Sequence, residues 1–203
     1  VFDLNEVRGH TIREDDGYPG VRARLPVALG KARLTIGIDV NFGDPIWPAP
    51  TEIDLPRLIQ IGQQPVRVLG YPLPMVVAEK IVTALQRGEA NTRWRDFADV
   101  LTISRSQDLF AVELRAAFEA VATYRDIPLR PLSPRLDRMP LIAQAKWANW
   151  RRRQSHAKDL PEQFDEVLRT VTTFVDPVLD ATATPAADSY WDSARQTWMK
   201  KAR

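Results

Sequence analysis

Cysteine is absent from this chain of 203 residues, and histidine occurs only twice, as His10 and His156. The lack of cysteine excludes a disulfide scaffold, a thiolate zinc site and a cysteine nucleophile. Two isolated histidines exclude a multi-histidine metal centre and argue against a Ser-His-Asp triad. The chain also lacks a long apolar run and a signal-like start, so we expect a cytoplasmic protein that does not contact membranes.

Several catalytic signatures are missing too: the sequence contains no GxGxxG, Walker A, HExxH or GxSxG pattern. The usual dinucleotide, P-loop, zincin and hydrolase interpretations therefore have no support. The composition is 44% hydrophobic and 27% charged with a net charge of +2, which is typical of a globular chain. The length suits one medium domain, or one domain with a small second lobe.

The first third of the sequence has the alternation of β-strands. Residues 21–27 and 34–42 alternate apolar and polar side chains, and Gly30-Lys31 lies between them, which predicts an antiparallel hairpin. We expect the apolar face of the second strand to pack on a core. Residues 43–57 are rich in proline and are predicted to be a loop, and residues 66–69 are predicted to form a short strand.

From Pro74 onward the apolar residues follow a helical period. The predicted helices span about residues 74–87, 92–104, 108–121, 142–153 and 161–175, and residues 190–198 are predicted to dock back as a terminal segment. Segregated strands and helices indicate an α+β fold. We expect residues 1–73 to form a small sheet and residues 74–203 to form a helical lobe.

Four polar features stand out against this pattern. Asp39 lies in the middle of a strand beside Gly37, where a cation or phosphate has room to approach; a solvated strand face is the alternative. Lys80 lies on an amphipathic helix, and it suits a triphosphate if it is partly enclosed; otherwise it is simply solvated.

Asp96 and Asp99 share one helix face at i,i+3 spacing, with Arg93 and Arg95 beside them. This cluster is either a site or a surface ion-pair ladder. In the predicted helix at 142–153 and just after it, basic residues alternate with indoles, namely Lys146, Trp147, Trp150, Arg151, Arg152 and Arg153. They could bind phosphates and stack bases, or they could complement the helix dipole.

Four segments together resemble a known family. They are Tyr18-Pro19-Gly20-Val21-Arg22, Ile38-Asp39-Val40-Asn41-Phe42-Gly43-Asp44, Ala78-Glu79-Lys80 and Arg93-Trp94-Arg95-Asp96-Phe97-Ala98-Asp99. In this order they resemble the AbiEii/AbiGii (MenT-like) nucleotidyltransferase toxins, and the likeness runs over most of the chain.

The resemblance implies a polymerase-β-like nucleotidyltransferase, the toxic half of a bacterial toxin–antitoxin pair, which transfers a nucleotide from an NTP to the 3′ acceptor end of tRNA. It implies a cognate antitoxin as partner and Mg²⁺ as cofactor. Asp39, Lys80 and Asp96 match the family's catalytic positions, and Asp39 would be the metal ligand. Lys80, Arg93 and Arg95 would bind the nucleotide, and Lys146, Trp150, Arg151 and Arg152 would bind the nucleic acid.

The chain departs from the family pattern at one point. The family begins with a Gly-Ser or Gly-Gly turn and two aspartates one residue apart on the next strand, and neither Asp15-Asp16-Gly17 nor Asp3-Leu4-Asn5 reproduces this motif. We therefore expect the chain to begin downstream of that motif. A non-catalytic relative that binds nucleotide, RNA or an antitoxin is the alternative function, and a structural module with solvated charges is a third possibility.

Overall fold

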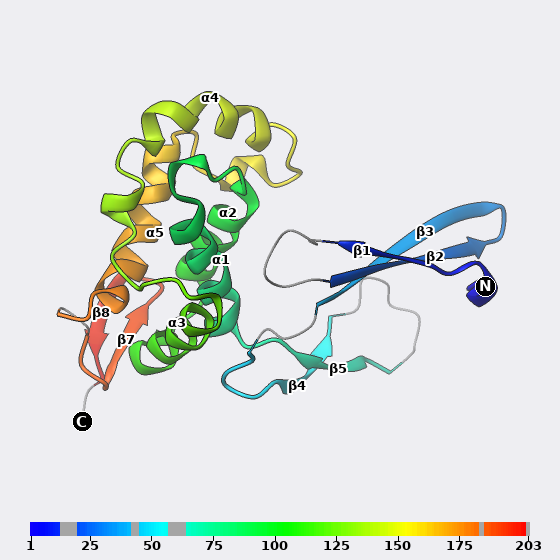
Figure 1. The fold of residues 1–203 in the computed structure, drawn as a ribbon, viewed down its shortest axis with the longest axis horizontal. Helices are drawn as coiled ribbons and strands as arrows, with labels where there is room; N and C mark the ends of the chain where they lie inside the picture. Colours follow the sequence, from blue (N-terminus) through cyan, green and yellow to red (C-terminus); the bar gives the residue numbers. More distant parts are fainter. Residues whose placement is uncertain (13–19, 42–44, 57–63, 183–184, 202–203) are drawn as a thin grey trace. The chain divides into compact units, whose positions relative to one another are not determined.

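The computed structural model describes residues 1–12, 20–41, 45–56, 64–182 and 185–201. The chain divides into two compact units, Val1–Pro45 and Ile46–Arg203. The predicted α+β class is confirmed, because antiparallel strands precede the helices and a small sheet closes the chain (Figure 1). The division expected between residues 73 and 74 stays a prediction about domains. Parts of two resemblance segments, residues 18–19 and 42–44, lie outside the described residues, as does Asp15-Asp16-Gly17.

In the unit Val1–Pro45 the predicted hairpin is confirmed. A 3₁₀ turn, Leu4–Glu6, precedes an antiparallel sheet of order β1-β2-β3, with bounds Arg8–Ile12, Gly20–Leu29 and Ala32–Asn41. Gly30 adopts a φ of 58° in the turn between β2 and β3, a conformation that favours glycine.

The expected burial of β3 is wrong. Its apolar face is 41–60% exposed at Leu34, Ile36, Ile38 and Val40. The alternation of side chains is as predicted, but the described residues of Val1–Pro45 form a single sheet layer with no second layer to cover that face.

The unit Ile46–Arg203 begins with a two-stranded antiparallel sheet, β4 (Thr51–Leu55) and β5 (Val66–Gly70). The strand at 66–69 was predicted, whereas β4 lies inside the stretch predicted to be a loop. The prolines that suggested a loop flank β4, at Pro50 and Pro56 among others, but none lies within it. Between them Ile53 and Leu55 alternate with acidic residues, which is sufficient for a five-residue strand.

Each of the five predicted helices is present in the described part of the chain. Their bounds are α1 Leu73–Arg87, α2 Trp94–Ser106, α3 Ala111–Arg125, α4 Met139–Arg151 and α5 Phe164–Leu179. Gly88 has a φ of 56° and follows α1, as its position predicted. Short 3₁₀ turns lie at Gly88–Ala90, Ser133–Arg135 and Ala157–Asp159. No helix among the described residues is both long enough and apolar enough to cross a bilayer.

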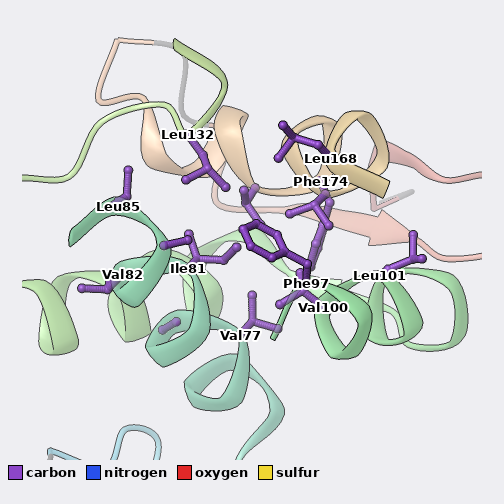
Figure 2. Close-up of a cluster of buried hydrophobic side chains, with 14 of the residues drawn as sticks. Val77, Ile81, Val82, Leu85, Phe97, Val100, Leu101, Leu132, Leu168 and Phe174 are labelled. Atoms are coloured by element: carbon purple, nitrogen blue, oxygen red, sulfur yellow. The ribbon is translucent and has the colours of Figure 1, made fainter. Parts of the chain in front are cut away.

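The helices enclose an apolar core to which α1, α2 and α5 contribute Ile81, Phe97 and Phe174 (Figure 2). Phe164, at the start of α5, is fully buried and is the aromatic centre of this core. Its ring lies 5.5 Å from Trp94 and 5.3 Å from Phe97, both edge-on, and 5.5 Å from Trp147. Such edge-to-face pairs add stabilisation beyond their buried area.

The C-terminal segment docks on the helices as predicted. It forms β7 (Ser189–Asp192) and β8 (Thr197–Lys200), and β7 also pairs with β6 (Leu109–Phe110). Trp191 is fully buried, lies 4.9 Å from the ring of Phe174, and donates its indole N–H to the Ser104 carbonyl at 2.7 Å.

The contact between Asp192 and Arg195, in the turn after β7, should make the stability of the protein depend on pH. The Asp192 carboxylate accepts hydrogen bonds from the backbone N–H and then the guanidinium of Arg195, and these lower the pKa of Asp192 below its ordinary 3.8. The folded state then binds fewer protons than the unfolded state, so this stabilisation is present above about pH 4 and is lost as the pH falls through the lowered pKa. In denaturant titrations between pH 2 and pH 6, Asp192→Asn should show a smaller loss of stability in acid than the wild type. An unchanged acid profile in this variant would contradict the assignment.

Candidate active site

Lys80 lies between two carboxylates of the neighbouring helix. Its Nζ, from α1, is 3.1 Å from Oδ1 of Asp96 and 2.7 Å from Oδ2 of Asp99, both on α2. The i,i+3 spacing puts the two aspartates on one helix face, as the sequence predicted. The side chain of Lys80 is 19% exposed and that of Asp96 only 7%, so the group is largely withdrawn from water.

Arg93 completes this cluster at the start of α2. Its Nε donates to the second oxygen of Asp96, and its backbone N–H donates to the Asn91 side chain at 2.9 Å. Asp96 therefore bridges two cations, Lys80 and Arg93, and fixes where both point. Arg95, also predicted to bind nucleotide, is exposed on α2.

The cluster can offer positive charge to a phosphate. Its charges balance, since Lys80 and Arg93 face Asp96 and Asp99. The two acids differ in burial, because the side chain of Asp99 is 43% exposed and that of Asp96 only 7%. A phosphate that replaces Asp99 beside Lys80 would keep the ammonium paired, while Asp96 stays in place beneath it.

Asp39 belongs to the other compact unit. On β3 it accepts a bidentate pair of hydrogen bonds, both at 2.6 Å, from Nε and Nη2 of Arg22 on β2. These hydrogen bonds, and then the charge of Asp39, raise the pKa of the Arg22 guanidinium. Arg22 was not among the residues predicted for this site. A two-residue turn at 30–31 pairs position 22 with position 39, so counting back from Gly30-Lys31 would have found it.

The described residues do not fit a magnesium ion as they are arranged. They contain no group of three or more His, Cys, Asp or Glu side chains that could hold a metal. The carboxylates that Mg²⁺ would need already contact cations, with Asp39 at Arg22 and both Asp96 and Asp99 at Lys80.

The basic, tryptophan-rich helix divides into packed and exposed residues. Trp150 stacks on buried Trp147 at 5.2 Å, and Arg151 donates to the Leu160 carbonyl at 2.8 Å. Lys146 and Arg152 are exposed. Helical spacing identified this patch, but it could not show that Trp150 packs against the core or that Arg151 joins α4 to the chain that follows.

A comparison of the sequence with models of protein families finds a match, and the matched range includes Lys80 and Asp96. The family model described as "Nucleotidyl transferase AbiEii toxin, Type IV TA system" matches residues 2–170, which is most of the chain. No curated protein and no solved structure matches. The resemblance inferred from the sequence is confirmed, and the chain belongs to the AbiEii nucleotidyltransferase toxins of type IV toxin–antitoxin systems.

Proposed function

We propose that this chain transfers a nucleoside monophosphate from an NTP to RNA, with the 3′ acceptor end of tRNA as the acceptor. Membership of a nucleotidyltransferase toxin family supports an NTP as the substrate and an antitoxin as the partner. The observation that carries the proposal is the position of Lys80, a largely enclosed ammonium held between Asp96 and Asp99.

In the proposed reaction a ribose hydroxyl of the RNA attacks the α-phosphorus of the NTP. The new P–O bond forms as the bond to the β-phosphate oxygen breaks, and pyrophosphate leaves with the charge that develops. Lys80 stabilises this charge, and Arg93 and exposed Arg95 contact phosphate oxygens. Asp96 holds Lys80 and Arg93 in register with the triphosphate. The hydroxyl proton passes to water, and the catalytic part expected of Asp39 from the resemblance stays a prediction.

For the acceptor RNA we propose the basic helix α4. Exposed Lys146 and Arg152 would contact phosphates, while Trp150 and Arg151 would present a face already fixed by packing. Indole and guanidinium groups suit single-stranded acceptor ends, because both stack on bases.

The test is label transfer from each of the four NTPs to total tRNA in the presence of Mg²⁺. We expect label on tRNA with at least one NTP, and a loss of about 10²-fold or more in Asp96→Ala, because Lys80 and Arg93 lose their shared anchor. Asp165→Ala is the matched control, since the ion pair of Asp165 in the described part of the chain is with Arg169 on the surface of α5. Wild-type protein that labels no tRNA with any NTP would contradict the proposal.

The alternative is a non-catalytic relative that binds nucleotide, RNA or the antitoxin. It is favoured by one observation, that Asp39, Asp96 and Asp99 each already contact a cation. Binding of NTP or tRNA without label transfer would identify this alternative.

A further inference from the structure

The polar face of the β1-β2-β3 sheet carries an unbalanced row of arginines. The strand register places Arg24 of β2 between Arg8 of β1 and Gly37 of β3. Two residues along, the same register places Arg22 next to Asp39. Because paired residues and residues two apart point to the same side of a sheet, these side chains share one face.

Arg8 and Arg24 lie directly opposite each other, an arrangement of like charges that destabilises an antiparallel pair. The ion pair of Arg8 with Glu6 is 3.8 Å long and is formed by side chains that are 84% and 60% exposed. It therefore offsets little of the repulsion between Arg8 and Arg24. Arg24 is exposed and has no carboxylate partner among the described residues. Asp39 contacts Arg22 instead. The face therefore has room for an anion beside Arg24.

Gly37 supplies the space for that anion. A Cβ placed on Gly37 would meet no atom within 4 Å, so the strand backbone next to Arg24 is open to the outside. Arg33 continues the row on the same face of β3, four residues before Gly37 and roughly 13 Å along the strand. Positive charges spread over such a length match an extended polyanion better than a single small ion.

We propose that Arg8, Arg24 and the bare backbone at Gly37 form a phosphodiester-binding site that contacts the backbone of the acceptor RNA beside Asp39. This site rests on the proposed function in taking RNA as the polyanion, and it adds a second contact surface to the basic helix α4. Guanidinium groups suit phosphate oxygens because they donate two parallel hydrogen bonds.

The experiment measures the binding of labelled total tRNA to the full chain over a range of salt concentrations. Arg24→Gln and Arg8→Gln should each weaken binding roughly three- to sixfold near 0.15 M salt, and each should reduce the slope of log K against log salt by about 1. Arg24→Lys keeps the positive charge and should therefore leave the slope of log K against log salt unchanged. Gly37→Val should weaken binding without loss of stability, because valine favours strands and meets open space.

Arg67→Gln is the matched control. Arg67 is also a strand arginine, but it donates a hydrogen bond to the Asp54 carboxylate at 3.2 Å, so its charge already faces a carboxylate on the next strand. Its substitution should leave the slope unchanged.

The outcomes separate this site from the proposed function. An unchanged slope in both glutamine variants, or wild-type protein that binds no tRNA, overturns the site even if label transfer occurs. Reduced slopes with no label transfer from any NTP support the site and contradict the proposed function. If Arg24→Gln spares RNA binding but weakens binding of the antitoxin, the face is a protein interface and the RNA site is wrong.

Discussion

Replacing Lys80 by methionine should lower the proposed nucleotidyl transfer to tRNA by at least about 10²-fold, because the enclosed positive charge that we propose faces the triphosphate is lost. The protein should also be destabilised, by about 3 kcal/mol, since Asp96 is only 7% exposed and loses one of its two cations. Label transfer and urea denaturation would measure the two effects separately.

Two further variants distinguish chemistry from folding at this position. The double substitution Lys80→Met with Asp96→Asn removes the uncompensated charge, so stability should recover while transfer stays absent. Lys80→Arg keeps the charge and should retain stability, with partial transfer because a guanidinium is bulkier than an ammonium. A Lys80→Met protein that transfers label at the wild-type rate would show that the cluster is structural only.

Replacing Phe164 by alanine should destabilise the unit Ile46–Arg203 by about 3–5 kcal/mol. Phe164 is fully buried, and its removal leaves a cavity bordered by the rings of Trp94, Phe97 and Trp147. The measurement is the free energy of unfolding from urea titration, followed by the helical circular dichroism signal.

Phe110→Ala is the matched control for this cavity. Phe110 has the same side chain but is 39% exposed, so its truncation should cost less than about 1 kcal/mol. Equal effects of the two substitutions would contradict the central position of Phe164 in the core.

The helical half of the fold was predictable because its signals are local and repeated. The helical period of Val77, Ile81 and Leu85, followed by Gly88, identified α1 and its end. The strands were harder to predict, because their partners are distant in sequence. The prolines around Thr51–Leu55 hid β4, and alternation along β3 could not show whether another layer covers its apolar face.

The candidate site could be predicted only in part from the sequence. The i,i+3 spacing of Asp96 and Asp99 is a property of one helix, so their common face was predictable. Their contact with Lys80 depends on how α1 packs on α2, which the helical period alone does not specify. The packing of Arg151 on the Leu160 carbonyl was hidden for the same reason, because basic residues near a helix end give the same pattern whether exposed or packed.

The distribution of tryptophan gives the two compact units different spectroscopic signatures. All six indoles lie in Ile46–Arg203, and Trp147 and Trp191 are fully buried there. Intrinsic fluorescence will therefore report the melting of that unit, whereas Val1–Pro45 contributes no indole emission. A single fluorescence transition accompanied by two steps in circular dichroism would mean that the β-sheet of Val1–Pro45 unfolds independently.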